Sequence, residues 1–155
     1  MMKKIVIVAL MCSAMLCVYS CGKRTASPVG EPYSDYEGVY LELVSVDMAK
    51  DNKTMILQWH NDTAYEVRYD YDDEYCIEKK TDNGEWEECD VVMWVEECGD
   101  GYYIKPWEES GDIYEYDKYY KVSKKGTYRV GTVCSVYDGA EGPTVAKVWA
   151  EFEVK

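Results

Sequence analysis

The sequence predicts an all-β fold, an antiparallel β-sandwich of about seven short strands. Between residues 38 and 155, segments rich in Val, Ile, Tyr and Trp recur at short intervals. Turn-forming stretches that contain Gly, Asn, Asp or Pro separate these segments. Evenly spaced short strands of this kind are typical of a sandwich. About 118 residues are enough for one domain with a modest core.

The first twenty residues have the layout of a secretory signal peptide. Lys3 and Lys4 precede an uncharged apolar run that ends at Ser20 and Cys21. The run is shorter than the roughly 20 apolar residues that span a bilayer, so a transmembrane helix is the weaker alternative.

Residues 18–21, VYSC, resemble the short box that ends bacterial lipoprotein signals. The branched Val18 and the small Ser20 fit this pattern. The resemblance implies cleavage after residue 20 and acylation of Cys21, which becomes the lipidation site. It also implies a cell-envelope protein, lipid-anchored to a membrane and exposed outside the cytoplasm.

The chain is strongly acidic, with a formal net charge of −13. Removal of residues 1–20 takes away two lysines and no acid, which leaves 15 cations, 30 acids and a net charge of −15. Such a chain lacks the cations that neutralise phosphates, so no nucleic acid is expected as a partner. We also expect repulsion from anionic lipid, which leaves the membrane attachment to the lipid at Cys21.

Residues 22–37, GKRTASPVGEPYSDYE, contain Gly, Pro and Ser without a hydrophobic period. This composition predicts a flexible tether, so residues 21–37 are interpreted as the lipidated cysteine and its linker. Residues 38–155 then form the sandwich.

The expected strands alternate apolar and polar residues or form short apolar runs. The turn TDNG at residues 81–84 suits the positive φ angles of a hairpin. Pro106 must end a strand because it donates no ladder hydrogen bond. In chain order, the strands are expected within residues 39–46, 54–60, 64–71, 74–80, 85–95, 101–106, 112–120, 126–137 and 144–154.

Several of these segments resemble a family of bacterial immunoglobulin-like domains on exported and lipid-anchored proteins. The resemblance rests on NDTAYEV, CIEKKTDNGEW, GYYIKPWE, KGTYRV and the closing AEFEV. It implies an immunoglobulin-like antiparallel β-sandwich, and no particular activity. Pro106-Trp107 departs from the Pro-Gly that the family has at this point. In KGTYRV, Tyr128 is either a tyrosine corner that bonds back to the main chain or an ordinary core residue.

Four cysteines remain in the expected exported domain: Cys76, Cys89, Cys98 and Cys134. Their even number favours disulfides, with three connectivities open, over four free thiols. We favour Cys89 with Cys98, which closes a short loop, and Cys76 with Cys134, which joins two strands expected to be neighbours. A zinc site is disfavoured because no C-x-x-C pair occurs.

The sequence offers little for catalysis. His60 is the only histidine and is interpreted as structural or exposed, and no nucleophile elbow, phosphate loop or zinc motif occurs. We therefore expect no cofactor and no enzyme activity, with a carboxylate-dependent hydrolase as the least favoured alternative. The acidic run from Asp70 to Glu74 is either a calcium ligand set or, as we favour, a solvated turn.

Sixteen tyrosines and five tryptophans stand against one phenylalanine, so nearly every ring carries a polar group. Such rings suit half-buried sandwich positions and also binding surfaces. Tyr69, Tyr71, Tyr116 and Tyr119 are the candidate binding surface, with a protein or a carbohydrate as ligand. The expected function is a non-catalytic binding or structural module, and an inhibitor or regulator of an exported enzyme is the alternative.

Overall fold

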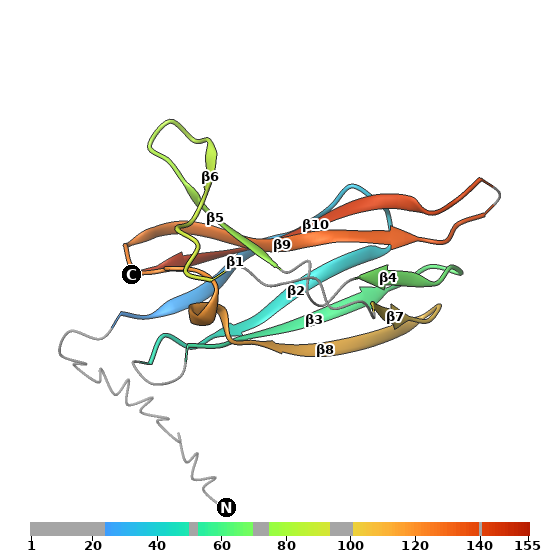
Figure 1. The fold of residues 1–155 in the computed structure, drawn as a ribbon, viewed down its shortest axis with the longest axis horizontal. Coiled ribbons are helices and arrows are strands. Elements are labelled where there is room, and N and C mark those ends of the chain that lie inside the picture. Colours follow the sequence, from blue (N-terminus) through green and yellow to red (C-terminus); the bar gives the residue numbers. More distant parts are fainter. Residues whose placement is uncertain (1–23, 50–52, 70–74, 94–100, 140) are drawn as a thin grey trace, which may run out of the picture.

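The computed structural model describes residues 24–49, 53–69, 75–93, 101–139 and 141–155. These residues form two packed antiparallel sheets, which confirms the predicted all-β sandwich (Figure 1). The described part has ten strands, more than the expected seven or so. They are β1 (Ala26–Ser34), β2 (Val39–Val46), β3 (Met55–Asn61), β4 (Val67–Tyr69), β5 (Cys76–Lys80), β6 (Trp86–Glu88), β7 (Tyr102–Ile104), β8 (Glu108–Tyr114), β9 (Gly126–Val136) and β10 (Thr144–Val154).

The larger sheet is built around the long hairpin of β9 and β10. Its strand order is β1-β10-β9-β4-β7, and β5 pairs with the other half of β9 and carries β6 outward. The smaller sheet has the order β2-β3-β8. A single 3₁₀ turn, Tyr116–Lys118, is the helical element among the described residues. Within those residues, no helix has the length and hydrophobicity to cross a bilayer.

The predicted flexible tether is wrong for residues 26–34, because they form the edge strand β1. Ala26 pairs with Val154 and Ser34 with Val148, and the register shifts between Val29 and Tyr33. None of the residues of β1 is fully buried and most are exposed, so its sequence carries no strong hydrophobic period. Prolines are also tolerated at an edge, where a missing N–H costs no ladder bond.

The core lies between the two sheets and is formed by alternate residues of the long strands. Leu41 of β2, Trp59 of β3 and Phe152 of β10 are fully buried. Their neighbours along each strand face outward, as the two-residue period of a strand requires. The alternation read from the sequence therefore identifies the inward faces of β2, β3, β9 and β10.

At the edge of the core, several buried tyrosines place their hydroxyls beside polar partners. The Tyr75 hydroxyl accepts a bond from Trp59 Nε1 at 3.0 Å and donates to Asp112 at 3.0 Å. The Tyr128 hydroxyl donates to the Lys124 carbonyl at 2.7 Å, which confirms the predicted tyrosine corner. A hydroxyl that finds a partner costs little to bury, which explains why this core uses tyrosine in place of phenylalanine.

The predicted Cys76–Cys134 disulfide is wrong, because both cysteines are free. Cys76 is paired with Gly131 of β9, whereas Cys134, itself in β9, is paired with Tyr69 of β4. Three residues along a strand separate the two positions by about 10 Å, beyond the 4.4–6.8 Å between Cα atoms that a disulfide needs. Cys89 is free as well, and Cys98 lies outside the described residues.

Candidate functional site

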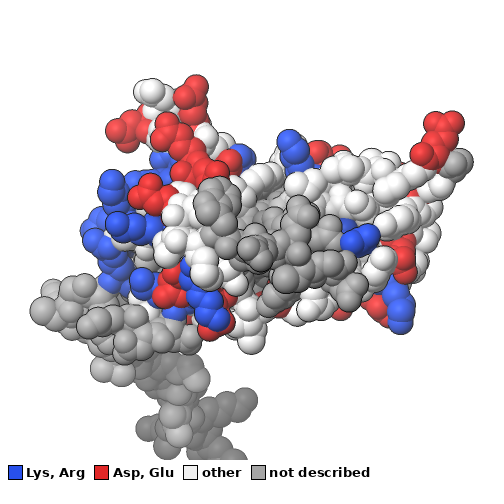
Figure 2. All heavy atoms as spheres, viewed as in Figure 1, with Lys and Arg blue, Asp and Glu red and all other residues white. Residues whose placement is uncertain are grey.

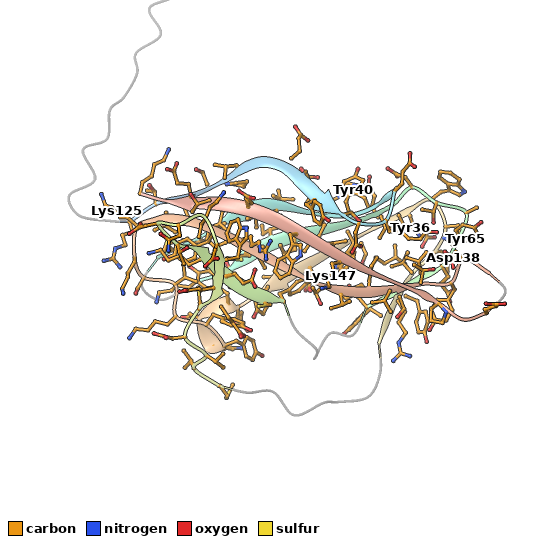
Figure 3. The ribbon with its side chains drawn as sticks, turned by 90° about the horizontal axis from the view of Figure 1, so that it is seen from above. Tyr36, Tyr40, Tyr65, Lys125, Asp138 and Lys147 are labelled. Atoms are coloured by element: carbon orange, nitrogen blue, oxygen red, sulfur yellow. The ribbon has the colours of Figure 1, made fainter. Side chains whose placement is uncertain are left out.

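A hollow of about 920 Å³ opens at one end of the sandwich, where three connections meet. They are the β1–β2, β3–β4 and β7–β8 connections. Figure 3 shows Tyr36, Tyr65 and Asp138 at this end, opposite the end that carries Lys125. We call it the aromatic hollow, and its lining residues are Asp35, Tyr36, Glu37, Gly38, Tyr40, Asp62, Thr63, Ala64, Tyr65 and Trp107.

Asn61, at the end of β3, holds two of these connections together. Its side chain is fully buried, and Nδ2 donates to the carbonyls of Tyr65 at 2.8 Å, Ile104 at 3.1 Å and Lys105 at 3.0 Å. Its Oδ1 accepts bonds from the N–H and the hydroxyl of Thr63, at 3.2 and 2.7 Å. One amide therefore bonds both loops that carry Tyr65 and Trp107.

The β1–β2 connection is fixed by polar contacts of its own. Tyr36 donates its hydroxyl to Asp138 at 3.2 Å, and the Asp138 carboxylate also accepts from Thr144 at 2.9 Å. Asp35 accepts the main-chain N–H of Lys147 at 2.6 Å. Gly38 closes the connection at φ 81°, and a Cβ there would lie 3.0 Å from Thr63 Cγ2. The hollow is thus a built feature of the fold.

Trp107 stands out because its backbone and its exposure are both unusual. It is the one non-glycine residue in the described chain with positive φ, at 62°, and its side chain is 70% exposed. Lys105 and Glu108 close a turn around it, with a 3.2 Å bond from the Glu108 N–H to the Lys105 carbonyl. In a turn with proline second and positive φ third, the third position favours glycine. A strained and exposed tryptophan there points to a role outside folding.

The hollow is electrostatically negative. Asp35, Glu37 and Asp62 are among its lining residues, and that lining includes no Lys or Arg. Burial, followed by the hydrogen bond to Asp138, raises the pKa of Tyr36 above its ordinary value. Burial and the nearby carboxylates, first Asp62, raise the pKa of Tyr40 in the same way. Neutral rings beside carboxylates form a site that attracts cationic groups.

His60 lies next to the hollow, where it is held by its neighbours. Its ring stacks on Tyr40, with centroids 4.4 Å apart. Nε2 lies 3.0 Å from Glu42 and Nδ1 lies 3.2 Å from Glu109, and the residue is 8% exposed. Both ring nitrogens of His60 contact carboxylates of neighbouring strands, which fixes the imidazole ring. The fixed ring in turn orients Tyr40, which stacks on it.

The predicted binding surface is wrong for two of its four residues. Tyr69 is 4% exposed and stacks on Trp59, with centroids 4.5 Å apart, and Tyr116 is fully buried. Tyr119 is partly buried and stacks on Tyr114. Tyr71 lies outside the described residues, as do Cys21 and the acidic run 70–74.

Sequence reasoning missed the rings that do line the hollow. Tyr36 fell within the supposed tether, and Tyr40 reads as an ordinary strand residue. The one available signal was Trp107, which takes the place of glycine after Pro106.

Among the described residues, no group of His, Cys, Asp and Glu side chains is arranged to hold a metal ion. Comparison with known protein families, with characterised proteins and with solved structures gives no match for this chain.

Proposed function

We propose that this protein is a lipid-anchored lipoprotein of the cell envelope, and that its immunoglobulin-like sandwich is a non-catalytic binding module. The aromatic hollow is the binding site in this proposal. The observation that carries it is Trp107, exposed on a strained turn beside three carboxylates. Strain of this kind persists where function selects the side chain.

The ligand is a protein segment that carries Lys or Arg side chains. The acidic, ring-lined hollow complements such groups both by charge and by cation–π contact. Exposed tryptophan and tyrosine are also the side chains that most often dominate binding energy in protein interfaces. A neutral carbohydrate could stack on the rings and donate hydroxyls to the carboxylates, but it would gain no attraction between opposite charges.

The contacts of the acidic and basic groups favour binding over hydrolysis. The carboxylates of Asp35 and Asp138 are engaged by donors within the fold, and both nitrogens of His60 face carboxylates. A carboxylate-dependent glycoside hydrolase needs a pair of carboxyl groups placed on either side of the substrate bond. An inhibitor of an exported enzyme remains a special case of the binding module, in which the partner is that enzyme.

Selection from a library of random displayed peptides tests the proposal, with a glycan array as the parallel arm. We expect the wild-type chain to enrich peptides rich in Lys and Arg, and the Trp107→Ala chain to enrich none of them. Tyr33→Ala, which removes an exposed ring outside the hollow, is the control. Binding to glycans alone would mean that the ligand is a carbohydrate and not a protein. Binding to neither the peptide library nor the glycan array would contradict the binding module.

A further inference from the structure

Strand register brings five cations to the end of the sandwich opposite the hollow. Ala26 pairs with Val154, and Val154 pairs with Gly126, so β1, β9 and β10 all have a terminus there. A Cβ on Gly126 would lie 2.9 Å from Lys79 Cε, which places the end of β5 beside them. We call this group the basic end, and its members are Arg24, Lys79, Lys124, Lys125 and Lys155.

Nearby acids offset part of the basic end, since Glu87 lies across the β5–β6 ladder from Lys79. Lys155 forms an ion pair with Glu153 at 3.2 Å, and Lys79 lies over the Tyr128 ring at 5.6 Å. Lys124 and Lys125 are exposed in the connection before β9. Figure 2 shows Lys and Arg gathered at this end with some Asp and Glu among them, and further Asp and Glu at the tips of the β5–β6 and β9–β10 hairpins.

Because residues 26–34 form β1 and not a flexible tether, the basic end lies close to Cys21 along the chain. The described chain begins at Arg24, only three residues after Cys21, and β1 begins at Ala26. Three residues span at most about 10 Å, even when fully extended. A lipid on Cys21 would therefore hold Arg24 within about one Debye length of the membrane surface.

We propose that the basic end docks on an anionic lipid surface and so directs the aromatic hollow away from the membrane. This inference rests on the lipid anchor of the proposed function. The net negative charge of the chain does not prevent docking, because charge is felt only over about 8–10 Å at physiological salt. β9 alone has 11 residues, or about 35 Å, between the basic end and the far end.

The lipidated chain, purified from membranes and reconstituted on vesicles, allows a direct test. One set of vesicles contains phosphatidylcholine alone, and the other also contains phosphatidylglycerol. Lysine acetylation is followed residue by residue by mass spectrometry, at low and at high salt. Lys105, exposed at the far end beside the hollow, is the internal control.

On the anionic vesicles at low salt, acetylation of Lys124 and Lys125 should slow by at least about fivefold relative to neutral vesicles, the effect expected for one cation near such a surface. High salt should remove the protection, and Lys105 should react equally in all conditions. The charge reversal Lys124→Glu/Lys125→Glu should remove the protection of Lys155, whereas Lys105→Glu/Lys147→Glu should not.

Equal acetylation of the basic end on both vesicle types would overturn the docking and leave the anchor intact, provided that the chain floats with both. Equal protection of the basic end on both vesicle types would also overturn the docking. The short connection from Cys21 to Arg24 would then explain the protection without any attraction to anionic lipid. A chain that floats with neither vesicle type would overturn the anchor, and the docking with it.

Discussion

The side-chain amide of Asn61 donates a hydrogen bond of 2.8 Å to the main-chain oxygen of Tyr65. The same amide bonds the carbonyls of Ile104 and Lys105, so one buried side chain links the two loops beneath the aromatic hollow. The segment of Tyr65 and the turn that carries Trp107 thus bond to the same residue at the end of β3, and the Thr63 hydroxyl adds two bonds to Tyr65, at 3.1 and 3.3 Å.

Asn61→Ala should lower the free energy of unfolding by about 3 kcal/mol or more, because it leaves buried polar groups of both loops without partners at about 1–3 kcal/mol each. Asn61→Asp should be at least as destabilising at neutral pH, since it sets a buried carboxylate oxygen against the three carbonyl oxygens that Nδ2 now contacts. Urea unfolding of both variants measures the difference. A loss below about 1 kcal/mol in Asn61→Ala would show that the loops are held by other contacts.

Gly131→Ala should be strongly destabilising, by about 1–3 kcal/mol as for other overpacked sites. A Cβ at this position would lie 2.1 Å from the Val148 carbonyl oxygen and 2.4 Å from Trp149 Cε3. Trp149 in turn holds Arg129, whose guanidinium lies 4.2 Å from its ring and 4.5 Å from that of Trp86.

Gly111→Ala is the control for this substitution, because nothing lies within 4 Å of a Cβ there. Thermal unfolding should show a large drop for Gly131→Ala and little or no drop for Gly111→Ala. Equal drops would mean that the close approach at Gly131 is not what determines its stability.

Stability should fall at alkaline pH. Burial raises the pKa of Cys76 to about 11 and that of Cys134 to about 12, and it raises the pKa of Tyr75 as well. A group whose folded pKa lies above its unfolded value stabilises the fold below the unfolded value, near 8.5 for a thiol, and loses that contribution as the pH rises toward the folded value. Urea unfolding should therefore show a decline between about pH 8.5 and 12.

Cys134→Ala should make this alkaline decline shallower, although it lowers stability at every pH through lost packing. An unchanged slope would mean that Cys134 does not contribute to the decline. Alkylation of the folded chain near neutral pH should also be slow at all three described thiols, because the thiolate is the reactive form.

Cys21→Ala should abolish incorporation of labelled fatty acid in a bacterial host. In the proposed lipoprotein, Cys21 is the only residue that accepts the acyl chains. The unlipidated precursor of Cys21→Ala should therefore accumulate or be released. Cys76→Ala keeps Cys21 and should be labelled like the wild type. Labelling that persists in Cys21→Ala would contradict the anchor.

The sequence predicted the sandwich because its long strands alternate cleanly. It missed β1 because an edge strand with Pro28 and Pro32, exposed along most of its length, looks like a linker. Turn chemistry was also readable: Gly84 has φ 85° in the hairpin predicted at residues 81–84.

The candidate site was harder to predict, for two physical reasons. Tyr69 shares the apolar side of its strand with Val67, but a tyrosine suits a core and a binding surface equally, so the residue type did not tell whether that side was buried. The hollow joins residues from three connections that only tertiary packing brings together. Trp107 alone carried a local signal, since a bulky residue took the place of glycine in its turn.

Trp107→Gly should raise the free energy of unfolding by about 1 kcal/mol, because glycine adopts a φ of 62° without strain and the exposed ring makes few contacts. Chemical unfolding measures this gain. A loss of stability would mean that the indole serves the fold and that its exposure has another cause.

The most direct test of the binding module is a calorimetric titration of the Trp107→Gly chain with a Lys- and Arg-rich peptide selected on the wild type. The variant should bind at least about 2 kcal/mol more weakly, roughly thirtyfold in Kd, while it folds as well as or better than the wild type. Tyr33→Ala should bind like the wild type. Unchanged affinity in the stably folded Trp107→Gly chain would contradict the assignment of the aromatic hollow as the binding site.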